Sequence, residues 1–296
     1  MRAESLKEHT MTPSSLNAQE IRYQISQIKE IPSLPQSVHR LIEIINDEVE
    51  SAEELESIIS YDQALTAKML RIANSTYYGY RKKIRTLAGA ILTIGLTQAR
   101  SICLFTLLNS LLTNGRKLDP AHRERLWKHS FASSRIAAEI AKKRPWMKLK
   151  EAAILGLMHD IGHVVMAMHF REQFEYIVEL ADQRKNPLWC VEMQTGLSHT
   201  EIGKYLAARW ALPEVFQNVI EFHHSPDKCK SFQVETKLIY LANILANSRE
   251  FPELLNDEAT LAYCRDLYIS EEEWEEYQDG LKLIWPEVEQ LWNLLS

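Results

Sequence analysis

The sequence predicts an all-α protein built from two packed helical lobes. Only 9 of its 296 residues are glycine and 10 are proline, so few positions suit the tight turns that join strands. Apolar residues recur at intervals of three and four along most of the chain. No segment alternates for long enough with the period of two that is typical of a half-buried strand.

In the first lobe, capping residues and apolar periodicity predict six helices. The first begins at the capping box Asn17–Glu20, the third begins at the capping box Ser51–Glu54, and Asp62 caps the fourth. Gly95 is a stop signal for the fifth helix. The predicted ranges are about 17–30, 38–45, 51–59, 62–73, 87–94 and 97–112.

After Gly115 the predicted helices are longer. Their ranges are 120–143, 149–169, 172–184, 188–209, 213–224 and 234–248. The segment 257–295 adds two or three more, one beginning at the capping box Ser270–Glu273 and one with Pro286 in its first turn. We therefore expect a flexible tail at 1–16, a first lobe at 17–115, a second lobe at 116–249, and C-terminal helices at 250–296 packed on the second lobe.

Composition excludes several classes of protein. Hydrophobic residues make up 46% and charged residues 25%, as in an ordinary soluble protein. The formal net charge of −6 gives no support to general nucleic-acid binding. Four scattered cysteines form no CxxC pair, and we see neither a signal peptide nor a membrane span of ~18 uninterrupted apolar residues. These features predict a cytoplasmic protein with no membrane partner.

The polar pair His159–Asp160 interrupts the apolar stretch Glu151–His169. Helical phasing places the pair in or beside the core, where a carboxylate is costly unless it is paired, hydrogen-bonded or bound to a cation. A hydrogen-bonded core pair is the more common outcome for a single His-Asp dipeptide.

Other histidines in the second lobe favour a metal site over that simpler interpretation. The candidate ligands are His129, His159, Asp160, His199, His223 and His224, with His163 on the same helix face as His159. A set of imidazoles with one carboxylate suits iron, zinc, manganese or nickel better than magnesium or calcium.

The order of these residues resembles the HD superfamily of metal-dependent phosphohydrolases, and most closely its HDOD branch (HD-related output domain). The matching segments cover about Ile21 to Ala246. They read IPSLPQSVHRLIEIIND, ELESIISYDQALTAKMLRIANSTYYG, ILTIG, LWKHSFASSRIAAEIA, AILGLMHDIGHVVMA, LSHTEIGKYLAARWALP, IEFHHSP and LIYLANILA. The resemblance implies an HD-like helical bundle in the second lobe, and a His, a His-Asp pair and a distant Asp as ligands of one or two metals.

Three departures from the catalytic branches stand out. Asn243 occupies the place of the distant aspartate, His163 replaces the lysine of HD-GYP phosphodiesterases, and Ser225–Asp227 replaces their Gly-Tyr-Pro. The departures favour a bacterial-type regulatory module, with a degenerate metal pocket, that acts through a signalling protein partner or a nucleotide ligand. The alternative is a metal-dependent phosphohydrolase acting on a nucleotide or a cyclic dinucleotide. The family is often fused to receiver domains, and we expect this chain to receive its signal through a partner or a ligand.

A basic cluster, Arg81, Lys82 and Lys83, follows three tyrosines. Aromatic and cationic side chains together can stack on a base and hold a phosphate. A solvated loop is the more common role of such a charge run. The cluster is a candidate ligand or partner surface.

Overall fold

The computed structural model describes residue 23 and residues 33–43, 52–79, 83–113 and 119–295. All regular elements in these residues are helices and none is a strand, which confirms the all-α prediction. The predicted helix at 17–30, the tail at 1–16 and Gly115 lie outside the described residues, apart from Tyr23.

The first lobe follows the predicted order closely. Its helices are α2 (Gln36–Glu43), α3 (Ala52–Ser60), α4 (Gln63–Ala73), α5 (Leu87–Ile94) and α6 (Leu96–Thr113). Asp62 caps α4 as expected, because its carboxylate accepts from the backbone N–H groups of Ala64 and Leu65 at 2.9 and 3.0 Å. Gly95, with φ of 87°, ends α5, and the chain bends by 110° into α6.

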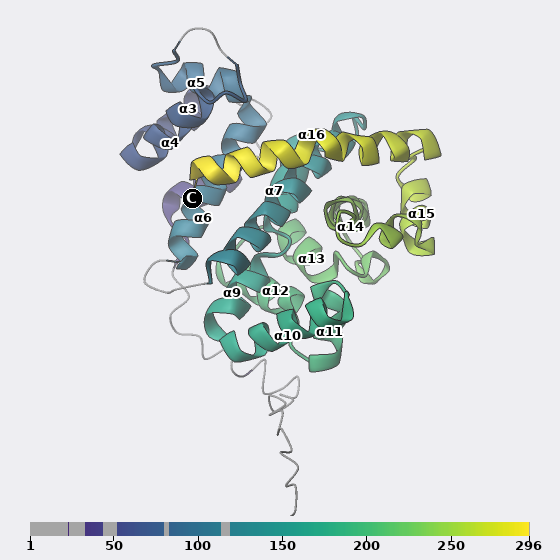
Figure 1. Cartoon of the computed structure of the whole chain (residues 1–296). Helices are drawn as coiled ribbons and strands as arrows, with labels where there is room; N and C mark the ends of the chain where they lie inside the picture. The colour runs from purple at the N-terminus through teal and green to yellow at the C-terminus, as the bar shows by residue number, and fades with distance from the viewer. Residues whose placement is uncertain (1–22, 24–32, 44–51, 80–82, 114–118, 296) are drawn as a thin grey trace, which may run out of the picture.

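The second lobe is arranged around α7, which packs against α8, α14 and α16. Helices α7, α14 and α16 are labelled in Figure 1. Its elements are α7 (Pro120–Lys142), α8 (Leu149–Met158), α9 (Ile161–His169), α10 (Arg171–Arg184), α11 (Leu188–Thr195), α12 (His199–Arg209), α13 (Glu214–Phe222), the 3-10 turn η2 (Pro226–Lys228) and α14 (Gln233–Asn247).

Two helices predicted as continuous are each broken. The predicted helix 149–169 divides at His159–Asp160. In a continuous helix, the side chains of two adjacent residues point in different directions. His159 and Asp160 instead lie against each other in one centre, and the helix breaks between α8 and α9 to allow this. The predicted helix 188–209 divides at Gly196, whose φ of 78° is the left-handed conformation that ends a helix. Each break places a histidine or an aspartate at a helix end.

The C-terminal segment forms η3 (Pro252–Asn256), α15 (Glu258–Asp266) and α16 (Glu271–Leu295). Ser270 caps α16 by accepting from the Glu273 N–H at 3.2 Å. Pro286 lies inside α16 and does not begin a helix, since Ile284 and Val288 on either side of it are both buried and hold the helix together.

Helix α16 packs on α7 and α14 of the second lobe and also reaches α4 of the first (Figure 1). The Lys68 ammonium donates to the Leu295 carbonyl at 3.0 Å. The C-terminal helix therefore joins both lobes.

One described stretch, Glu151–His169, is apolar and long enough by composition to cross a membrane, and α5 and α6 would pass the same test only as a bent pair. The first stretch is 83% buried against other helices. Its apolar side chains therefore serve the protein core.

Candidate metal centre

A single carboxylate, Asp160, lies among five imidazole nitrogens. Its Oδ2 is 3.4 Å from both His129 Nε2 and His159 Nε2, and 3.5 Å from His163 Nδ1. Its Oδ1 is 3.2 Å from His199 Nε2 and 3.3 Å from His223 Nε2. The four Nε2 atoms thus form two pairs, one pair at each oxygen, and His163 lies beside the Oδ2 pair.

These side chains come from four places in the second lobe. Helix α7 carries His129, the break between α8 and α9 carries His159 and Asp160, α12 begins with His199, and His223 follows the last residue of α13. Their convergence agrees with the candidate set proposed from the sequence.

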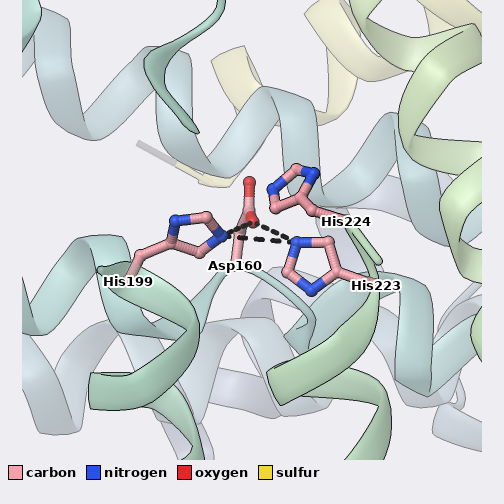
Figure 2. A group of neighbouring side chains, drawn as sticks. All are labelled: Asp160, His199, His223 and His224. Atoms are coloured by element: carbon pink, nitrogen blue, oxygen red, sulfur yellow. Dashed lines mark hydrogen bonds and ion pairs between the residues drawn. The ribbon is translucent and has the colours of Figure 1, made fainter. Parts of the chain in front are cut away.

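Figure 2 shows the Oδ1 side of the centre, where His199 and His223 direct ring nitrogens at Asp160 and His224 lies beside them. Ligand atoms of these four residues all lie within 4.8 Å of one another. The His224 ring also stacks on Trp189 at 4.5 Å between centroids. All six predicted site residues are therefore brought together.

A glycine contact holds His199 at the centre. A Cβ built on Gly162 would lie 1.9 Å from the His199 carbonyl oxygen, so α9 and α12 can approach this closely only because residue 162 has no side chain. Gly203 of α12 faces the same contact, with its own Cβ position 3.3 Å from the Gly162 nitrogen. The glycine that follows His159–Asp160–Ile161 thus positions a histidine that is distant in sequence.

Backbone carbonyls select which nitrogen of two histidines faces the carboxylate. His159 Nδ1 lies 2.8 Å from the Gly156 carbonyl, and His223 Nδ1 lies 3.0 Å from the Ile220 carbonyl. A carbonyl oxygen only accepts, so both Nδ1 atoms carry the proton and donate it. The lone pairs of both neutral rings are then on Nε2, directed at Asp160, which is how histidines are oriented to bind metals.

Glu192 of α11 is a functional residue that the sequence analysis missed. Its Oε2 accepts from the His199 backbone N–H at 2.9 Å and lies 2.6 Å from His199 Nδ1. Its Oε1 lies 2.5 Å from His163 Nε2, and the His163 ring stacks on His199 at 3.9 Å. Its signal in the sequence was a lone carboxylate between apolar Val191 and Met193, seven residues before a histidine.

The charges of the centre are strongly coupled. Burial lowers the pKa of His129 and of His159 to about 4, although Asp160 opposes the shift, so both rings are neutral at pH 7. Burial would also lower the pKa of His199, but the Glu192 and Asp160 carboxylates raise it to about 10. Burial would raise the pKa of Asp160, yet the surrounding histidines hold it well below its ordinary value. Without a metal, His199 therefore carries a proton at pH 7.

Asn243 lies on the Oδ2 side of the centre. It is buried in α14, beside His129. Burial lowers the pKa of His129, and contact with Asn243 partly opposes that effect. Its Oδ1 accepts from Asn247 Nδ2 at 2.7 Å, whereas its own Nδ2 is buried without a hydrogen-bond partner among the described residues. Asn243, which the sequence resemblance aligns with the distant aspartate, is thus a neutral neighbour of His129.

The residues fit a divalent ion. His224 Nε2 is buried with no hydrogen-bond partner in the described part of the chain, and its ligand atom lies within 4.8 Å of those of Asp160, His199 and His223. The Nε2 atoms of His129 and His159 are 3.3 Å apart, as are those of His199 and His223. Two nitrogens that bind one ion at the usual ~2.1 Å lie roughly 3.0 to 3.4 Å apart. The unpartnered nitrogen and the spacing of the two Nε2 pairs both suit a divalent ion.

The basic cluster after the tyrosines is only partly described. Arg81 and Lys82 lie outside the described residues, and Lys83 is exposed. The Tyr77 hydroxyl donates to Glu287 at 2.8 Å, and its ring meets Tyr78 edge to face. These two tyrosines therefore make contacts within the protein. A ligand or partner surface at Arg81, Lys82 and Lys83 stays a prediction.

Comparisons with known proteins identify the family and the fold of this chain. The HDOD domain family matches residues 31–226. An uncharacterized protein of Treponema pallidum (strain Nichols) is 30% identical over 202 residues, which are 67% of this chain but only 38% of that protein. This chain therefore spans about two fifths of the length of its curated relative.

Two solved structures share the fold. An HDOD domain protein of unknown function from Geobacter sulfurreducens superposes with a TM-score of 0.76 at 26% identity, covering 93% of this chain and 98% of that one. A candidate signal transduction protein from Marinobacter aquaeolei VT8 superposes with a TM-score of 0.79 at 18% identity, covering 97% of this chain and 68% of that one. The second likeness establishes the fold alone.

Proposed function

This chain belongs to the HDOD family, and from that premise we propose that it is a cytoplasmic regulatory module that holds a divalent transition metal but hydrolyses phosphodiesters poorly. It acts by binding a nucleotide or a signalling protein. The observation that carries the proposal is the pairing of imidazole Nε2 atoms on both oxygens of Asp160, with a neutral amide beside one pair.

The two halves of the centre differ in what they offer a cation. The Oδ1 half has His199, His223 and His224 around one carboxylate oxygen. The Oδ2 half has His129 and His159, with His163 Nδ1 at 3.5 Å from the oxygen and the Asn243 amide beside His129. An amide is a weaker ligand than a carboxylate and adds no negative charge. We therefore assign the firmly held ion to the Oδ1 half.

This asymmetry favours binding over hydrolysis. A divalent ion at such a centre lowers the pKa of bound water and supplies a nucleophile at neutral pH, and paired ions stabilise both the attacking and the leaving oxygen. The chain's own residues orient the rings and exclude water, since the His159, His199 and His223 side chains are at most 1% exposed. Because the Oδ2 half would bind a second ion weakly, we expect the protein to signal through a bound ligand and not to hydrolyse it.

Phosphohydrolysis is the second candidate function, because His163 and Asp160 face an open cavity where a proton could be exchanged. Iron, zinc, manganese and nickel all suit the donors.

Elemental analysis of protein purified without chelators or a metal-affinity column tests the proposal. Wild type should carry about one first-row ion per chain, and Asp160→Ala should carry none. Asn243→Asp should raise metal affinity and content toward two ions. Wild-type turnover on cyclic dinucleotides and nucleoside monophosphates should be near background. Absence of metal, or brisk metal-dependent hydrolysis by the wild type, would contradict the proposal.

A further inference from the structure

A cavity of about 350 Å³ lies directly over the metal centre. Its floor includes His129, Asp160 and His163, and its wall includes Trp189 and Trp285. Ligand sites in proteins usually have volumes of ~300 to 1,000 Å³, so this cavity is at the small end of that range. It suits a ligand with one ring system and one phosphate better than a dinucleotide.

Part of the wall lies outside the residues that match the HDOD family. Trp285 and Glu289 belong to α16, and Arg249 follows α14, whereas the family match ends at residue 226. The C-terminal helices therefore shape the entrance to the centre. The C-terminal helices thus add wall residues to the cavity that the segment matched by the family does not provide.

The cations at the rim are held in place by neighbouring carboxylates. Lys128 Nζ lies between Glu124, at 2.5 Å, and Glu289. Arg249 pairs with Glu289 at 3.5 Å and keeps 60% of its side chain exposed. Because each of these carboxylates faces a cation, their charges are largely balanced. A divalent ion at the floor would itself attract an anion, because among the described residues Asp160 is the one carboxylate there that lines the cavity.

Two tryptophans form flat parts of the cavity wall. The Arg249 guanidinium lies over the Trp285 ring, 5.2 Å from the centroid, which fixes the ring at the rim. On the same cavity, Trp189 presents a second indole, held by stacking on His224. The wall thus provides flat apolar surfaces beside the Arg249 cation.

We infer that this cavity binds an organic phosphate with a planar ring, of the size of a nucleoside monophosphate. The phosphate faces the metal centre, and the ring contacts the tryptophans at the rim. Arg249 and Trp285 determine specificity, so α16 selects the ligand. The inference rests on the proposed function, because the phosphate is attracted by the bound ion.

The test uses full-length protein loaded with the ion that elemental analysis identifies. Calorimetry compares AMP, ribose 5-phosphate and inorganic phosphate. AMP should bind roughly tenfold or more tightly than ribose 5-phosphate, the effect of one stacked base. Trp285→Leu should remove that preference, and Arg249→Ala should weaken AMP several-fold, both with unchanged metal content. Arg249→Ala alters an exposed side chain, so it remains informative if Trp285→Leu folds poorly.

Matched controls are Trp146→Leu, which removes a 52% exposed tryptophan outside the cavity, and Lys282→Ala, which removes an exposed, ion-paired cation of α16. Neither should change AMP binding. Equal affinity for AMP and ribose 5-phosphate, or a metal-loaded protein that binds no phosphate, would overturn the inference and leave the proposed function standing. A wild type without metal would overturn both.

Discussion

Replacing Gly162 by alanine should separate the two helices that bring His199 to Asp160. The new Cβ would lie 1.9 Å from the His199 carbonyl oxygen and 2.9 Å from the Gly203 nitrogen, and real Cβ contacts are almost never below 3.0 Å. The backbone of α12 must therefore retreat by about 1.1 Å, because the atoms in its way are main-chain atoms that cannot rotate aside.

Two measurable losses follow from that shift. His199 Nε2 is now 3.2 Å from Asp160 Oδ1, and a retreat of this size takes it out of a shared coordination sphere. Overpacking a core typically costs ~1 to 3 kcal/mol, and for a domain of this length each kcal/mol lowers Tm by ~2 to 4 °C. We expect Tm to fall by roughly 2 to 12 °C and metal content to fall at least tenfold.

Gly280→Ala is the matched control for the melting and metal measurements. Nothing lies within 4 Å of a Cβ at Gly280, which is inside α16. Alanine there should raise stability by ~0.5 to 1 kcal/mol and leave metal content unchanged. A Gly162→Ala protein with wild-type Tm and full metal content would refute the close-contact argument.

Three further predictions concern Glu192, pH and Arg144. Glu192→Gln keeps the shape of the side chain but removes the charge that orients His199, so metal affinity should fall roughly 10- to 100-fold. The control Glu179→Gln, on the exposed face of α10, should not change metal affinity. Equal affinities of wild type and Glu192→Gln in a chelator competition assay would exclude a role of Glu192 in orienting His199. In metal-free protein, the pKa of His199 is raised from 6.5 to about 10, so its stabilising contribution is fully present below pH 6.5 and is lost as pH rises toward 10. Melting curves of chelated wild type should therefore decline between pH 6.5 and 9, and Glu192→Gln should flatten that decline; parallel curves for the two proteins would count against it. Arg144 is buried and donates to both carboxylate oxygens of Glu273, at 3.0 and 2.8 Å, and to the Leu267 carbonyl at 2.9 Å. Arg144→Ala removes these bonds, while Glu273 keeps Lys143 and Tyr277 as neighbours, so the protein should lose ~1 to 3 kcal/mol of stability in urea unfolding. A loss well below ~1 kcal/mol would show that the Arg144 contacts are dispensable.

Local signals in the sequence were enough to predict most helices. Asp62, Gly95 and Ser270 cap or end helices where the sequence analysis placed them, because a cap depends on residues within one turn of it. The candidate ligands were also identifiable, since a carboxylate inside an apolar stretch needs a partner and several histidines followed in a matching order.

Other features depended on contacts between distant segments. The break at His159–Asp160 was not predicted, because the apolar period continues across it and only the shared centre requires both side chains to face one way. Glu192 was missed because its partners are His163, 29 residues earlier, and His199, which a helix break brings next to it. Pro286 suggested a helix start, but it lies inside α16, because the buried residues before and after it pack against the core and stabilise a continuous helix.

The sequence by itself determined that the chain is helical, where most helices begin and end, and which side chains are candidates to bind a metal. It did so because helix propensity, capping and the cost of burying charge are local properties. Only the tertiary structure decided that two pairs of imidazole Nε2 atoms flank Asp160, that Asn243 lies beside His129, and that α16 lines the cavity above them. Those relations depend on how helices pack, and here packing turns on close approaches such as that of Gly162 to His199, which no local pattern encodes.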